Sequence, residues 1–113
     1  MENVENEIRK SFAQLSALKK NLPNTSEINE KYVKIFHKEI GRLVILGYKD
    51  LEEFKIPENE ITPRPTFYSP ETGTEYSDEK FVDRELMLMQ LDAVLTFFQL
   101  GSEKIEIGFQ SRN

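Results

Sequence analysis

Residues 76–100 read YSDEKFVDRELMLMQLDAVLTFFQL, and this segment decides the fold that the sequence predicts. Its apolar residues recur at helical spacing on two faces, so most of the circumference of a helix here would be apolar. Such a helix is not stable in water on its own, because its exposed apolar area is too large. We therefore expect it to form the centre of a packed domain or of an oligomer.

The boundaries of this helix are predicted from its flanking residues. Ser77 is a favourable N-cap, acidic residues follow it at the positive end of the helix dipole, and Gly101 suits the end. These signals predict a helix over residues 78–100. Within it, Glu85, Asp92 and Gln99 recur every seven residues. A buried Asp92 would need a cationic partner, whereas the seven-residue spacing favours an exposed polar line.

Two further helices are predicted before this segment. Apolar residues at steps of three or four predict a helix over residues 3–21, with a narrow apolar stripe. A second helix is predicted over residues 26–46, with Ser26 as N-cap and Gly47 as a left-handed terminator. Gly41 lies inside it, where a close helix crossing or a kink would explain a glycine.

The segment between the second and third helices has no helical period. Four of the five prolines lie in residues 49–77, which we expect to form an irregular connection. Within it, residues 66–76 predict a small hairpin, with a turn over residues 69–72 and a left-handed Gly73. Apolar and polar residues alternate over residues 104–110, which predicts a short C-terminal strand.

The expected fold class is mostly α: a three-helix antiparallel bundle with a small β-hairpin and a short C-terminal strand. The length of 113 residues suits a single helical domain over residues 1–113. The second and third helices should form the core. Residues 1–22 either lie along them or pack on another subunit, and the narrow stripe favours the second arrangement.

Composition narrows the classes of partner. The chain has 20 acidic and 15 basic residues, and its net charge of −5 argues against binding to nucleic acid. It has no cysteine, which fits a cytoplasmic location. An acidic start after Met1 indicates no secretory signal, and charged residues interrupt the longest apolar run, so we expect no membrane partner.

Sequence motifs give little indication of catalysis. The single histidine, His37, has no metal-ligand partner at helical spacing, so we predict no metal and no cofactor. The sequence contains no glycine-rich phosphate loop, no GxSxG and no HExxH. We therefore expect a protein that is not an enzyme, and a hydrolase based on His37 is the least favoured hypothesis.

The proline-rich connection gives one candidate for a ligand site. Arginine can hold phosphate or carboxylate, aromatic rings can stack, and threonine hydroxyls can orient a bound group. Such residues could together capture or sense an anionic, possibly nucleotide-like, small molecule. In the alternative interpretation the aromatic residues cover the edge of the core and the arginine pairs with an acidic helix. The candidate residues are Arg64, Phe67, Tyr68, Thr72, Thr74 and Tyr76.

The leading hypothesis is a non-enzymatic, self-associating helical interaction module, as a homo-oligomer or a subunit of a larger assembly. The predicted helices carry more apolar surface than three short elements can cover, and such surface is typical of protein interfaces. We place the interface on the first helix and on the second apolar face of the third. The candidate residues are Ile8, Phe12, Leu15, Leu18, Leu86, Met89 and Phe97.

Overall fold

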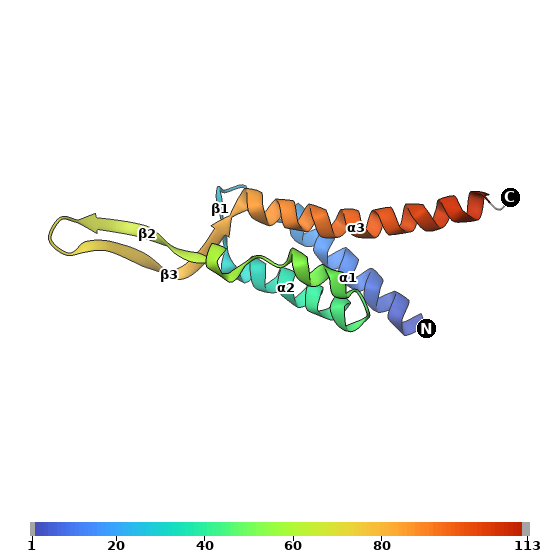
Figure 1. The fold of residues 1–113 in the computed structure, drawn as a ribbon. Coiled ribbons are helices and arrows are strands. Elements are labelled where there is room, and N and C mark those ends of the chain that lie inside the picture. The colour runs from blue at the N-terminus through green and yellow to red at the C-terminus, as the bar shows by residue number, and fades with distance from the viewer. Residues whose placement is uncertain (1, 112–113) are drawn as a thin grey trace.

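The computed structural model of the protein describes residues 2–111 and contains helices and a small sheet (Figure 1). The helices are α1 (Glu2–Lys20), α2 (Glu30–Ile45) and α3 (Arg84–Ser111), with two 3-10 helices, η1 (Lys49–Phe54) and η2 (Glu58–Glu60). The strands are β1 (Glu27–Asn29), β2 (Thr62–Ser69) and β3 (Gly73–Asp83). They form an antiparallel sheet in the order β1-β3-β2.

The predicted fold class is therefore wrong: the protein is mixed α/β rather than a three-helix bundle with a small hairpin. Residues 78–83, predicted as the first turns of the third helix, belong to strand β3. Ile28 of β1 lies opposite Val82 of β3, and both side chains are fully buried. Ser77 caps no helix, because its hydroxyl accepts from the N–H of Arg64 and donates to the carbonyl of Glu79.

The second helix also begins later than predicted. Asn29, not Ser26, is the N-cap of α2, and its side chain accepts a hydrogen bond of 2.9 Å from the N–H of Lys31. The carbonyl of Ser26 instead accepts from the N–H of Arg84, at 2.9 Å. Residues 27–29 thus pair with β3 in the sheet, and the chain becomes helical only after them.

The predicted C-terminal strand over residues 104–110 is also wrong, because α3 continues as a helix to Ser111. A lone strand leaves its backbone donors and acceptors unpaired, whereas a helix satisfies them within the segment. As Figure 1 shows, this end of α3 extends past the other helices, while the β2–β3 hairpin projects from the opposite end of the molecule. The molecule measures 74 × 24 × 22 Å as a result.

The core lies where the three helices, η1 and the base of the sheet meet. α1 packs on both α2 and α3, so it lies along the other two helices of its own chain. Leu15 and Leu18 of α1 are buried by the chain itself. The largest fully buried side chains of the other elements are Phe36, Ile28, Ile40, Leu43, Leu51, Met87, Leu91, Val33, Val82 and Val94.

Two turns predicted from glycine are confirmed. Gly47 has φ of 117°, its N–H donates to Val44 O at 3.0 Å, and the N–H of Tyr48 donates to Leu43 O at 3.0 Å. This pair of hydrogen bonds is the Schellman ending of α2. Gly73 has φ of 88° and opens β3 directly after the hairpin turn.

Gly41 lies inside α2 and, unlike Gly47 and Gly73, does not have a positive φ. We therefore expect Gly41→Ala to stabilise the protein. A Cβ placed there meets no heavy atom within 4 Å, which removes the close helix crossing as an explanation. Alanine in a helix interior is favoured over glycine by about 1 kcal/mol, and the free energy of unfolding should rise by that order. Urea denaturation would measure it. Gly47→Ala is the matched control and should destabilise the protein, because φ of 117° is strained for alanine.

Candidate interaction site

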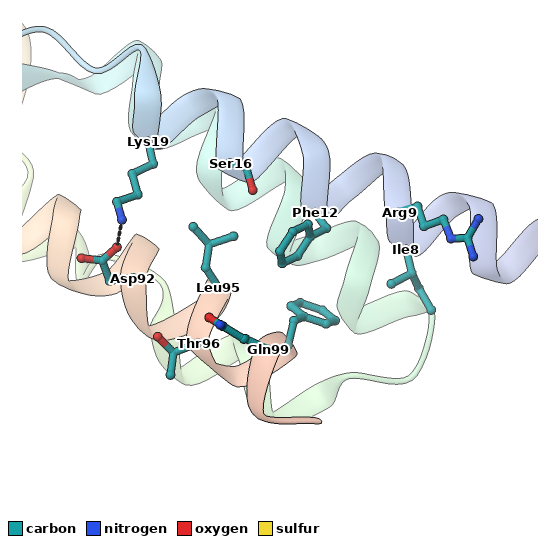
Figure 2. Close-up of a pocket in the computed structure, with 10 residues that line it drawn as sticks. Ile8, Arg9, Phe12, Ser16, Lys19, Asp92, Leu95, Thr96 and Gln99 are labelled. Carbon is teal, nitrogen blue, oxygen red and sulfur yellow. Dashed lines mark ion pairs between the residues drawn. The ribbon is translucent and has the colours of Figure 1, made fainter. Parts of the chain in front are cut away.

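A groove of about 600 Å³ runs between α1 and α3 (Figure 2). Its apolar part is formed by Ile8 and Phe12 of α1 and by Leu95 and Phe98 of α3. The rings of Phe12 and Phe98 meet edge to face, with centroids 6.0 Å apart. Phe12 remains more than a third exposed. This surface, called the α1–α3 groove below, is an apolar hollow open to solvent.

Charged side chains mark the two ends of the α1–α3 groove (Figure 2). Lys19 pairs with Asp92 across one end, with Nζ and Oδ1 2.5 Å apart, and Arg9 lies toward the other. Both members of the pair are about half exposed, so the pair orients the side chains and adds little stability. Asp92, Glu85 and Gln99 are all exposed, which confirms the predicted polar line on the third helix.

Arg42 of α2 forms an ion pair with α1. Its Nη2 lies 2.7 Å from Oε2 of Glu7 in α1, and its Nη1 lies 3.3 Å from Oε1 of the buried Glu39. The hydrogen bond from Arg42 lowers the pKa of Glu7 below its usual range, and the charge of Lys10 acts in the same direction. α1, which forms one side of the α1–α3 groove, is therefore linked to α2 through Glu7 and Arg42.

A second apolar surface lies on α3 itself. Leu86, Met89, Ala93 and Phe97 are spaced by three and four residues, so they share one side of the helix. Met89 is 64% exposed, Phe97 is more than a third exposed, and Leu86 and Ala93 are partly buried. These four residues, called the α3 stripe below, belong to the second apolar face that the sequence predicted.

The structure divides the seven predicted interface residues among three places. Ile8 and Phe12 line the α1–α3 groove, and Leu86, Met89 and Phe97 lie on the α3 stripe. Leu15 and Leu18 are buried in the core of their own chain, so they are not available to a partner. The apolar stripe of the first helix is thus divided, because its C-terminal part is buried within the chain while Val4 and Phe12 remain exposed.

Sequence reasoning missed Leu95 and Phe98 as parts of the open groove. The helical period assigns both to an apolar face of the third helix, which is correct. The part of that face left open by α1 depends on how α1 and α3 cross, and no local sequence signal reports a crossing. Only the packed structure identifies these two side chains as groove residues.

The six predicted ligand residues are not gathered around one point. Arg64 lies at the base of the hairpin, where its Nε is 3.1 Å from Oε1 of Glu27 and its Nη2 is 3.5 Å from Oδ1 of Asp83. Its guanidinium also donates to Thr62. The alternative interpretation expected this arginine to pair with an acidic helix, whereas its partners are carboxylates of strands β1 and β3. The other five are distributed along the hairpin as far as its turn: Phe67, Tyr68, Thr72, Thr74 and Tyr76.

His37 connects α2 to the segment that follows η1. Its Nε2 accepts a hydrogen bond of 2.9 Å from the N–H of Ile56, and its ring lies beside Phe36. Burial lowers the pKa of His37 below its usual range, and the charge of Lys55 lowers it further, while Glu52 opposes the change. His37 is thus held as a neutral acceptor. In the described part of the chain, no three acidic or histidine side chains lie close enough together to hold a metal ion.

We expect the stability of the protein to fall as the pH drops below the normal histidine value. Because the pKa of His37 is lower in the folded protein than in the unfolded chain, the unfolded chain takes up a proton at higher pH than the folded protein. Acid therefore favours unfolding from about pH 6.5 downward. The contribution is complete above that pH and is lost as the pH falls toward the folded pKa. Urea denaturation between pH 7.5 and 5, in roughly half-unit steps, would measure the slope.

His37→Gln is the control for this pH dependence. Glutamine can offer an oxygen to the N–H of Ile56 but does not titrate, so the slope between pH 7.5 and 5 should flatten. Glu7 does not confuse the result, because its lowered pKa acts only below its ordinary value of 4.5. An unchanged slope in His37→Gln would assign the pH dependence to another group.

Comparisons with known proteins identify no relative. No protein-family model matches the sequence, no curated protein matches it, and no solved structure matches its fold. Within residues 2–111, none of the helices combines the length and apolar character that a bilayer span requires. The features of the molecule that bear on its function are therefore the α1–α3 groove, the α3 stripe and the other surface that it exposes.

Proposed function

We propose that the protein is a non-enzymatic, self-associating interaction module that forms a homodimer through α1 and α3. The observation that carries the proposal is the amount of exposed surface. A compact monomer of 13.2 kDa exposes roughly 6,400 Å², whereas this chain exposes 8295 Å². Its radius of gyration of 18.2 Å likewise exceeds the value of about 13 Å for a compact domain of this length.

This additional surface is large enough for a stable interface. It amounts to about 1,900 Å², and a stable dimer buries about 800 Å² on each partner. Part of the additional surface follows from the elongated shape of the molecule, in which the β2–β3 hairpin projects from the helices (Figure 1). The part on the helical body includes the α1–α3 groove and the α3 stripe, where apolar side chains meet solvent.

The occupant that we propose for the α1–α3 groove is the α3 stripe of a second copy. A groove lined by apolar side chains binds the apolar face of a helix, and α3 presents such a face through Leu86, Met89, Ala93 and Phe97. Each copy offers one groove and one stripe. Two such contacts related by a two-fold axis close the assembly as a dimer and leave neither surface open.

The first test is the mass of the protein in solution. Sedimentation equilibrium across the micromolar range should give twice the 13.2 kDa of one chain, with dissociation on dilution. A mass of one chain throughout that range would contradict the proposal. Removal of residues 1–21 is not a suitable variant, because α1 contributes Leu15 and Leu18 to the core and its loss would unfold the protein.

The alternative function, capture of an anionic small molecule by residues 62–76, has less support. Within residues 62–76 the only basic residue is Arg64, and Lys80 follows on the same hairpin. Two carboxylates already neutralise the guanidinium of Arg64. An anion would have to displace Glu27 and Asp83 from Arg64, which costs two ion pairs. Arg64→Ala is therefore expected to lower the melting temperature of the protein without any ligand, as a structural residue would.

A further inference from the structure

The β2–β3 hairpin exposes an unusual group of aromatic side chains. It projects away from the helices (Figure 1), and Phe67, Tyr68 and Tyr76 on it are 58%, 68% and 60% exposed. Single exposed apolar residues are common, but three aromatic residues on one short ribbon are not. Aromatic side chains are enriched where proteins bind each other. The hairpin therefore has the character of a contact surface.

The strand register places the two tyrosines on one face. Tyr68 lies opposite Thr74, and Tyr76 is two residues from Thr74 on β3, so both rings stand on the same side of the ribbon. Phe67 lies opposite Glu75 and points to the other side. Tyrosine contributes a large ring and a hydroxyl at a small cost in side-chain entropy, which suits recognition of another chain.

The charge of the hairpin is negative overall, because residues 62–83 hold five carboxylates and two basic residues, Arg64 and Lys80. Glu71, Glu75 and Asp78 are exposed and have no ion-pair partner among the described residues. Of the other hairpin carboxylates, Asp83 pairs with Arg64 and Glu79 accepts a hydrogen bond from Asn29. Carboxylates next to aromatic faces attract arginine and lysine, through ion pairs and through cation–π contact.

One edge of the hairpin is also open to pairing. Strand β1 covers β3 only over Phe81–Asp83, so the same edge of β3 is uncovered from Gly73 to Tyr76, before the irregular residues 77–79. The edge of β2 is protected by Pro63 and Pro65, whereas residues 73–76 contain no proline. An added peptide strand could therefore use backbone donors and acceptors of β3.

We propose that the β2–β3 hairpin binds an extended, basic segment of a different protein. Basic side chains on one face of that segment stack on Tyr68 and Tyr76, and basic side chains on its other face pair with Glu75, which lies on the Phe67 side of the ribbon. Glu71 at the turn and Asp78 beyond Tyr76 add negative charge at the two ends of this surface. A second copy of this chain is disfavoured, because two hairpins would bring like charges together. Nucleic acid is disfavoured for the same reason. This surface is separate from the α1–α3 groove, so the inference does not depend on the proposed dimer.

The test uses the full chain and a labelled peptide of known sequence. Fluorescence anisotropy would follow binding of a peptide of alternating arginine and lysine, which presents basic side chains on both faces of an extended strand, with an aspartate–glutamate peptide of equal length as its counterpart. We expect saturable binding of the basic peptide alone. The double variant Tyr68→Ala, Tyr76→Ala keeps the net charge of the protein, and it should weaken binding roughly tenfold or more.

Charge variants separate the hairpin from general attraction to an acidic protein. Glu75→Lys with Asp78→Lys should abolish binding, whereas Glu53→Lys with Glu58→Lys changes the net charge equally at exposed sites away from the hairpin and should have a much smaller effect. Absence of saturable binding would overturn the proposal. Equal losses in the two charge variants, full binding by the tyrosine double variant, or preference for a single-stranded oligonucleotide would each overturn it as well. Circular dichroism would check that every variant is folded.

Discussion

Phe36→Ala is expected to cost about 4 kcal/mol of the free energy of unfolding. Phe36 lies in the middle of α2 and is completely buried in a core shared with α1 and α3. Its removal takes a large ring out of an apolar environment and leaves a cavity that the helices can fill only in part. Domains are stable by about 5–15 kcal/mol, so the variant should be close to unfolding at physiological temperature.

The measurement is urea denaturation followed by circular dichroism, at one protein concentration because association adds to the apparent stability. Ile45→Ala is the control on the same helix. Ile45 is 85% exposed, and its truncation should change the free energy of unfolding by less than about 0.5 kcal/mol. A loss below about 1 kcal/mol for Phe36→Ala would mean that α2 does not pack as described.

Local signals predicted the turns and the first two helices. Gly47 and Gly73 have positive φ, as their positions after a helix and inside a hairpin suggest. The helix predicted over residues 3–21 corresponds to α1, and the helix predicted over 26–46 contains α2. Each of these features depends on residues within a few positions of one another, which is the range that sequence patterns report.

The strand at residues 77–83 was not predictable in this way. Ser77, Asp78 and Glu79 form a favourable start for a helix, and the sequence offers no local reason to reject it. The competing structure is held together by Val82 opposite Ile28, which is more than fifty residues away in the chain. Burial of both side chains and a backbone ladder between them outweigh the local preference for a helix.

In the candidate interaction site, too, local features were predicted from the sequence and tertiary features were not. The period of the third helix identified Leu86, Met89 and Phe97 as one apolar face, and the structure leaves that face partly exposed. On the third helix Leu91 and Val94 are fully buried, whereas Leu95 remains partly open and lines the α1–α3 groove. This difference in burial depends on how α1 and α3 pack against each other. All three strands lie between these two helices in the sequence, so local patterns do not report their packing.

A negative charge in the α1–α3 groove or on the α3 stripe is expected to dissociate the proposed dimer. Phe12→Asp changes the groove and Met89→Asp changes the stripe, and each contact of the dimer uses one of each. A carboxylate buried at an apolar contact loses its hydration without gaining a partner. Either substitution should weaken the dimer about a hundredfold, and sedimentation equilibrium at micromolar concentration should then give the mass of one chain.

Ile45→Asp is the matched control, because it places the same charge on an exposed apolar residue of α2 outside both surfaces. Its mass should remain that of the unchanged protein. Met89 is already 64% exposed, so a folded Met89→Asp variant is expected even if Phe12→Asp proves less stable. If Phe12→Asp dissociates the protein while Met89→Asp does not, the groove receives another part of the second copy. If all three variants keep the dimeric mass, the copies associate elsewhere, and the α1–α3 groove is not the interface.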